Sequence, residues 1–278
     1  MTVINTNTGS LYAQQAMTTN ARGLSTVMQQ LSTGKRINNA VDDVAGMAIS
    51  TRLTSQIRGL NQAVRNTNDG ISMIQTAEGA TEQVTNMLQR MRELAVQASN
   101  DTNNSSDRGY LNLEFQALTS QIGDIANNTQ WNGTSVLNGT GGASGTFTFQ
   151  VGANSGQSVS IKFSDMTTGN TGTLSDIASQ NVTSTSTSSA ALGVIISALD
   201  TVSMERSNMG AVISRLQFTS DNLANVSAKA QESRSRIEDT DYSQATTELA
   251  KRNIIQQAAQ AMLAQANQQP QSVLQLLR

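Results

Sequence analysis

The chain has 278 residues, of which 37% are hydrophobic and 14% are charged, and its formal net charge is −2. Histidine and cysteine are both absent, which excludes disulfides, zinc sites built from those side chains and hydrolases that depend on a histidine base. We therefore expect a protein that is not an enzyme and holds no cofactor or metal. Basic residues are scattered singly, so the sequence does not predict nucleic acid as a partner.

The first residues contain no basic region followed by a long apolar core, and the chain contains no apolar run of about 18 residues. We therefore expect no cleavable signal peptide and no membrane insertion. The single proline and the 3% of aromatic residues are typical of long helices packed through small and aliphatic side chains.

A helix is predicted in the first part of the chain, because apolar residues recur there at steps of four and three. The stripe consists of Ala13, Met17, Asn20, Leu24, Val27 and Leu31. Gly34 provides a stop signal for this helix. In the connector that follows, Asp42 or Asp43 is expected to cap the next helix, since a carboxylate satisfies free backbone N–H groups there.

A long second helix is predicted from about residue 44 to 99, with a phase slip near Ala77–Ala80 at which a bend is expected. A turn cluster at residues 100–106 and a new apolar repeat from Leu111 to Ile125 predict a helical hairpin. Between about 129 and 189 the period changes. Residues 146–151 and 158–163 alternate polar and apolar side chains, which predicts a β-hairpin, and residues 181–189 are expected to form an exposed loop.

Helical spacing resumes at Leu192 and continues to about Arg236, and Asp241 with Gln244 predicts the start of a terminal helix. The terminal stripe is Ile255, Ala259, Met262, Ala266, Gln269, Val273 and Leu276, and further apolar rows that include Leu277 lie beside it. Burial of about five large side chains contributes roughly 10 kcal/mol, which is less than the cost of ordering the segment alone at about 1.5 kcal/mol per residue. We expect this helix to pair with the first one and to complete its burial against other copies of the chain.

The residues expected to carry self-assembly are Met17, Leu24, Leu31, Ile255, Met262, Val273, Leu276 and Leu277. The predicted fold is mainly α: a long coiled-coil-like helical rod with nested N- and C-terminal helices and a small β-hairpin region in the middle. We expect an inner-core domain from residues 1–42 and 236–278. An outer-core helical domain is expected at 43–235, with a short variable region at about 138–189.

Three stretches of the sequence closely resemble bacterial flagellin: Leu31–Ile49, Gln89–Gln97 and Met262–Arg278. With the repeats between them, the resemblance covers about residues 1–140 and 190–278. It implies a structural subunit that polymerises into the flagellar filament for swimming motility, a secreted, extracellular location and type III export. The partners that it implies are many copies of the same chain, an export chaperone, and the filament cap and hook–filament junction proteins.

In some flagellins the outer-core helices are recognised by Toll-like receptor 5. Here Arg90, Leu94 and Glu114 match the family positions and Gln89 lies nearby, so the resemblance implies receptor or inter-subunit contact at these residues. A hook–filament junction protein, whose terminal helices are similar, is an alternative, although the ending at Arg278 and the full motif at 31–49 favour flagellin. A secreted adhesin or binding module presented by the Ser/Thr-rich region is the other alternative.

Overall fold

The computed structural model describes residues 6–169 and 172–276, with side chains described as far as residue 268. The chain divides into two compact units. Unit 1 contains Met1–Ile57 and Ala228–Arg278, and unit 2 contains Arg58–Ser227. The sequence places the limits between the inner-core and outer-core domains at 42/43 and 235/236, and these limits stay a prediction.

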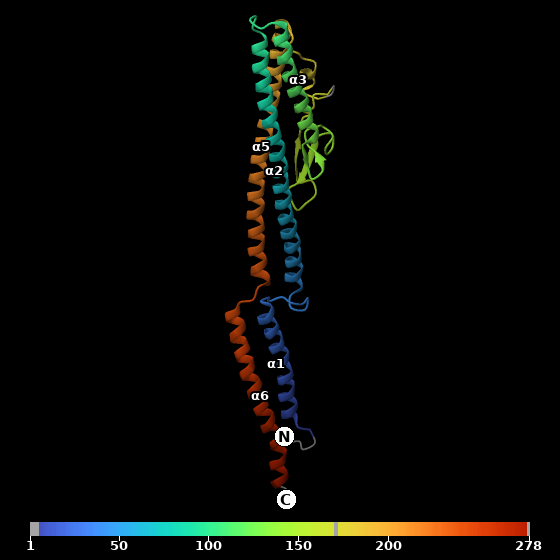
Figure 1. Cartoon of the computed structure of the whole chain (residues 1–278). Coiled ribbons are helices and arrows are strands. Elements are labelled where there is room, and N and C mark those ends of the chain that lie inside the picture. Colours follow the sequence, from blue (N-terminus) through green and yellow to red (C-terminus); the bar gives the residue numbers. More distant parts are fainter. Residues whose placement is uncertain (1–5, 170–171, 277–278) are drawn as a thin grey trace. The chain divides into compact units, whose positions relative to one another are not determined.

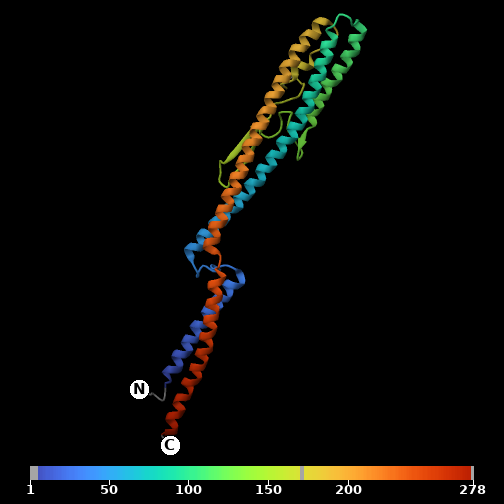
Figure 2. The ribbon, with the colours of Figure 1, turned by 90° about the vertical axis from the view of Figure 1, so that its left-hand side faces the viewer.

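Unit 1 is built on the pairing of helix α1 (Thr8–Thr33) with helix α6 (Tyr242–Leu276). Figures 1 and 2 both show the two helices side by side. The Asn7 Nδ2 atom donates to the Ala266 carbonyl at 2.8 Å, and the Asn20 Nδ2 atom donates to the Arg252 carbonyl at 2.9 Å. Because the partner numbers fall along α6 as they rise along α1, the pair is antiparallel.

The facing side of α1 is the one predicted: all six residues of its stripe are buried or half-buried. On α6 the predicted phase is partly wrong. The residues that are not exposed on the α1 side are Ala245, Leu249, Arg252, Gln256, Ala259, Leu263 and Ala266. This row keeps the steps of four and three, but Ile255 and Met262 lie outside it. The reason is that Arg252 occupies the seam: its guanidinium lies over Gly23, where a Cβ would have no room.

The connectors at the ends of these helices are bound to each other. Gly34 ends α1 with a left-handed φ of 70°, as the stop signal predicts. Lys35 forms a β-bridge with Asp239, and the Thr240 N–H donates to the Gly34 carbonyl at 2.9 Å. Asp43 Oδ1 accepts from the Gly46 N–H at 2.8 Å and so caps helix α2 (Val44–Ala98), whereas Asp42 accepts from N–H groups within the loop.

Unit 2 is a bundle of α2, α3 (Ser105–Asn128) and α5 (Thr185–Glu238) (Figure 1). The α2–α3 helical hairpin is confirmed, and a capping box between Asn104 and Asp107 starts α3. Helix α2 continues without interruption through Gly79. The largest fully buried side chains of the bundle include Ile74, Leu88, Met91, Leu94, Phe115, Ile122 and Ile195.

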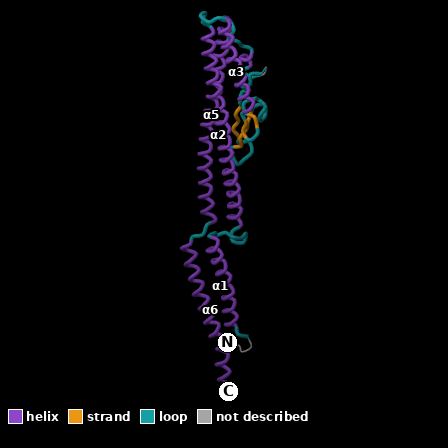
Figure 3. Tube along the Cα trace, viewed as in Figure 1, coloured by secondary structure: helices purple, strands orange, loops and turns teal. Residues whose placement is uncertain are grey.

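The predicted β-hairpin is confirmed as strands β3 (Thr146–Gln150) and β4 (Ser158–Lys162), which pair antiparallel and appear in orange in Figure 3. Phe149 packs against Gly70 of α2, where a Cβ would lie 3.1 Å from the ring. A second small hairpin, β1 (Gln130–Trp131) with β2 (Thr134–Ser135), was not predicted.

The expected exposed loop at 181–189 is wrong over its second half. Helix α5 already begins at Thr185, and Val182 and Ser188 are fully buried. Ser184 caps the helix: its Oγ accepts from the Thr187 N–H at 3.2 Å, while the Thr187 Oγ1 accepts from the Ser184 N–H at 3.1 Å. Ser and Thr are favoured at caps for this reason, so their high content here reflects a helix start and not an unstructured loop. Between the strands and α5 lies one further short helix, α4 (Ser175–Ala178).

The structure confirms a mainly α fold with long helices and small antiparallel strand pairs. One 18-residue window of α5 has a mean hydropathy of 1.3, which by length and composition alone would allow a membrane span. The apolar side of that helix is used inside unit 2, where Ala191, Ile195 and Val202 are buried in the core. Packing in the core accounts for part of this hydropathy, since 28% of the window is buried.

Candidate assembly surfaces

Helix α6 carries an apolar row on the side that α1 does not cover. Ile254 is 66% exposed, Met262 is 65% exposed and Ile255 is 41% exposed. Ala258 and Ala261 are exposed between them. Residues three and four apart lie on one side of a helix, so these side chains form one continuous strip. We call this strip, Ile254, Ile255, Ala258, Ala261 and Met262, the α6 outer row.

Helix α1 adds its own exposed apolar side chains. Leu11 is 57% exposed, Tyr12 is 74% exposed and Met28 is 57% exposed. Single exposed apolar residues, such as these on α1, are ordinary on a protein surface, but a continuous apolar row such as that on α6 is typical of an interaction site. Unit 1 therefore buries only part of the apolar surface that its two helices present.

The residues expected to carry assembly fall into three groups in the structure. Met17, Leu24 and Leu31 are half-buried on the face of α1 that meets α6, so they first hold the pair together. Ile255 and Met262 belong to the α6 outer row. Val273 and Leu276 lie beyond the last described side chain, and Leu277 lies outside the described residues. The contact between Gly23 and Arg252 was not predicted, because Arg252 lies outside the apolar rows identified in the sequence.

Charged and polar side chains join the connector after α1 to the ends of α2 and α5 in unit 1. Glu238 has a side chain only 14% exposed, and its carboxylate contacts the Lys35 Nζ at 2.5 Å and accepts from the Ser50 Oγ at 2.6 Å. The hydrogen bond from Lys35, followed by that from Ser50, lowers the pKa of Glu238. The Arg36 Nη2 donates to the Ile237 carbonyl at 2.7 Å. We call this arrangement of Lys35, Arg36, Ser50 and Glu238 the connector clasp.

A polar surface lies on unit 2 where α2 meets α3. Gln89, Arg90 and Glu114 are exposed, and the Arg90 Nε donates to the Glu114 Oε1 at 2.8 Å. Hydrogen bonds to Glu114 and then to Glu93 raise the pKa of Arg90. Leu94 does not share this surface: it is 1% exposed and belongs to the core. Leu94 therefore packs beneath this surface and does not form part of it.

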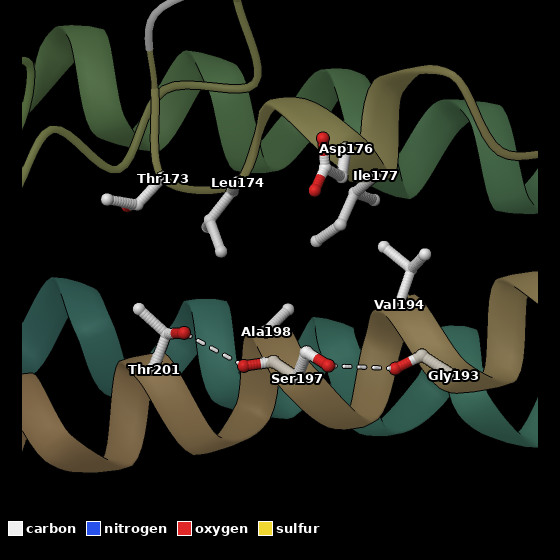
Figure 4. A pocket seen from close by; sticks show the side chains of 9 residues that line it. All are labelled: Thr173, Leu174, Asp176, Ile177, Gly193, Val194, Ser197, Ala198 and Thr201. Atoms are coloured by element: carbon white, nitrogen blue, oxygen red, sulfur yellow. Dashed lines mark hydrogen bonds between the residues drawn. The ribbon is translucent and has the colours of Figure 1, made fainter.

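A hollow of about 250 Å³ lies between residues 173–177 and α5 (Figure 4). Its lining comprises Thr173, Leu174, Asp176, Ile177, Gly193, Val194, Ser197, Ala198 and Thr201. The Ser197 and Thr201 hydroxyls donate to carbonyls of their own helix, at 3.2 and 2.8 Å. Neither hydroxyl is hydrogen-bonded to a base among these lining residues, so the hollow lacks the pairing of nucleophile and base that covalent catalysis requires. In the described part of the chain no group of three acidic side chains could hold a metal.

Most of the helical part of the chain matches families of known proteins. Residues 4–141 match the family described as "Bacterial flagellin N-terminal helical region", and residues 192–277 match "Bacterial flagellin C-terminal helical region". The chain belongs to the flagellin family. The unmatched residues between these two regions include β3, β4 and the start of α5, where the sequence is rich in Ser, Thr and Gly.

Flagellins of similar length align with the whole chain. The flagellin of Halalkalibacterium halodurans is 46% identical over 276 residues, which cover 99% of this chain and 100% of that protein. The flagellin of Bacillus subtilis is 39% identical, and 99% of each chain is covered. The flagellar filament 33 kDa core protein of Treponema phagedenis is 36% identical over 99% of this chain and 100% of its own length.

Two solved structures are similar to the chain, and one of them is a flagellin. The crystal structure of Bacillus cereus flagellin has a TM-score of 0.51 and 30% sequence identity, and the match covers 57% of this chain and 88% of that one. A putative flagellar hook-associated protein from Vibrio parahaemolyticus has a TM-score of 0.59, covering 71% of this chain and 100% of that one. Its identity of 14% shows a shared fold alone. The chain is thus a structural subunit of the bacterial flagellar filament, and flagellins are exported from the cell to form that filament.

Proposed function

We propose that the α6 outer row is the surface through which unit 1 assembles with other copies in the filament. The observation that carries this proposal is the exposure of Ile254 and Met262 on the side of α6 away from α1. Their burial by neighbouring copies is favourable by about 2 kcal/mol for each fully buried side chain. Leu11, Tyr12 and Met28 of α1 are further exposed apolar side chains of unit 1. We also propose that the subunit has two domains: an inner-core domain of residues 1–42 and 236–278, and an outer-core domain of residues 43–235.

The absence of cysteine from the chain makes this proposal directly testable, because any introduced thiol is unique. In Met262→Cys the thiol is expected to react with a maleimide dye in the monomer and to become protected after seeded assembly. Asn154→Cys, in the exposed β3–β4 loop, is the matched control and should react about equally before and after assembly. If the thiol introduced at position 262 stays reactive in filaments, neighbouring copies do not cover the outer row.

A second proposal concerns the polar surface of unit 2. We propose that Gln89, Arg90 and Glu114 are recognised by Toll-like receptor 5 in the free subunit. The exposure of all three side chains and the position of Arg90 in the flagellin-like motif support this proposal. Arg90→Ala should weaken binding to the purified receptor ectodomain, while Arg65→Ala, another exposed arginine of α2, should not. Equal binding by the Arg90→Ala variant and the wild type would contradict it.

The remaining proposals concern the other partners that the resemblance to flagellin implies. We propose that an export chaperone covers α6 before secretion, and that cap and hook–filament junction proteins meet the subunit at the ends of the filament. A chaperone that hides the outer row would keep subunits from assembling early. Mixing the chaperone with the Met262→Cys monomer should protect the introduced thiol without forming filaments. We propose no catalytic activity for the chain.

A further inference from the structure

The chain contains two Asn-Gly pairs with the same following residue, Asn132–Gly133 and Asn138–Gly139, each succeeded by threonine. An asparagine side chain can be attacked by the backbone nitrogen of the next residue. Glycine is the residue that hinders this attack least, because it has no Cβ and reaches many backbone conformations. Sequence alone therefore treats the two asparagines as equally reactive, and any difference between them comes from the fold.

Asn132 lies at the tip of the hairpin formed by β1 and β2. Its φ is 47° and that of Gly133 is 77°, which are the left-handed values of a two-residue type I′ turn. Both residues are exposed, and a Cβ on Gly133 would meet nothing within 4 Å. Within residues 6–169 and 172–276, neither the Asn132 side chain nor the Gly133 N–H makes a hydrogen bond. Each flanking strand has only two residues, so the turn opens at little cost.

Asn138 is held in place. Its Oδ1 accepts from the Thr140 N–H at 3.1 Å and from the Thr140 Oγ1 at 2.7 Å. Gly139 is crowded by Asp165, whose Cβ lies 3.0 Å from the position that a Cβ on Gly139 would take. The side chain therefore points toward Thr140, and the backbone beside it has little room to move toward the amide carbon.

We propose that Asn132 is a site of spontaneous deamidation in the folded protein, while Asn138 is protected by its contacts. In the first step the Gly133 nitrogen bonds to the Asn132 Cγ, the Cγ–Nδ2 bond breaks, and ammonia leaves after proton transfer. The resulting cyclic imide is then opened by water at either carbonyl carbon. The products are aspartate and isoaspartate, and the net reaction consumes one water and releases one ammonia.

Isoaspartate has structural consequences at this turn. It adds a backbone carbon to a two-residue loop, so Trp131 and Thr134 can no longer pair in the same register. Trp131 is the only tryptophan of the chain and packs against the core of unit 2. Its fluorescence therefore reports the change. The reaction also adds one negative charge to the surface of unit 2, whichever product forms.

The test compares both sites in one sample. The folded full-length chain is incubated in mildly alkaline buffer and digested with chymotrypsin, whose cleavage after Trp131 and Leu137 separates the asparagines for mass spectrometry. Deamidation at Asn132 should be about tenfold faster than at Asn138, since two hydrogen bonds must break before Asn138 reacts. The same incubation in urea should bring the two rates together, because both sites read Asn-Gly-Thr.

Thr140→Val provides the matched variant, since it removes the Oγ1 donor and should raise the rate at Asn138 while leaving that at Asn132 unchanged. Three results would overturn the proposal. The first is equal rates in the folded chain, and the second is no reaction at Asn132 while it remains folded. The third is a rate difference that persists in urea, because it would then arise from local sequence and not from the fold.

Discussion

The α6 outer row gives the sharpest quantitative prediction. In the double variant Ile254→Ala and Met262→Ala, two side chains about two-thirds exposed in the subunit lose most of the apolar area that assembly would bury. Complete burial of such a side chain contributes about 2 kcal/mol, so after allowance for their existing burial and the retained methyl groups the pair loses about 2 kcal/mol per subunit. This corresponds to a rise of about thirtyfold in the critical concentration for filament growth.

The assay is seeded elongation followed by sedimentation and electron microscopy over a series of subunit concentrations. The monomer should keep its thermal transition, because neither side chain faces α1. Gln257→Ala with Gln260→Ala is the matched control: both glutamines are exposed on the same helix, and their replacement should leave the critical concentration unchanged. A double Ile254/Met262 variant that grows filaments at the wild-type concentration would refute the reasoning, since these side chains would then stay in water.

Three further predictions concern pH and stability. Because the pKa of Glu238 is lower in the folded chain, its ionised form stabilises the connector clasp above a pH of about 4.5, and this contribution is lost as the pH falls through the folded-state pKa. Protection of residues 35–43 from hydrogen exchange, corrected for the intrinsic rate at each pH, should therefore fall on acidification, and Glu238→Gln should show a smaller pH effect. Glu205→Ala leaves the Ser164 N–H and hydroxyl without their acceptor and should reduce the free energy of unfolding of unit 2 by about 1 to 3 kcal/mol in urea titrations, whereas Ser164→Ala should cost less. Ser184→Ala should remove about 1 kcal/mol through loss of the α5 cap, and equal loss in the exposed control Ser186→Ala would contradict the capping assignment.

Sequence periodicity predicted the helices well, because apolar spacing reports which face of a helix is covered. It failed for the phase of α6, where Arg252 lies over Gly23 and the seam is held by Asn20 bonding to a backbone carbonyl. Spacing of apolar residues contains no information on such polar contacts. The contact role of Leu94 was implied by the resemblance alone, which does not show burial, and Leu94 lies in the core of unit 2.

Short-range signals were harder to interpret in the middle of the chain. The Ser/Thr-rich stretch at 181–189 has the composition of a loop, but Ser184 and Thr187 use their hydroxyls to start a helix. The Asn132–Gly133 pair is a strong turn signal, yet its strands have only two residues each and show no alternation. The composition of a window does not reveal the helix cap or the turn, since each depends on one or two residues at a fixed position.

The contacts between the β3–β4 hairpin and α2 determine where sequence can be added to this region. The hairpin approaches α2 at glycines: Phe149 lies over Gly70, and Ala153 leaves little room for a Cβ on Gly59. Beyond Ala153, residues 154–158 at the tip of the hairpin are exposed. The attachment is therefore concentrated at a few small residues, while the tip is free of the core. Foreign peptides inserted after Asn154 could lengthen the tip without disturbing that attachment, which makes this loop a natural location for displaying added sequence on every subunit.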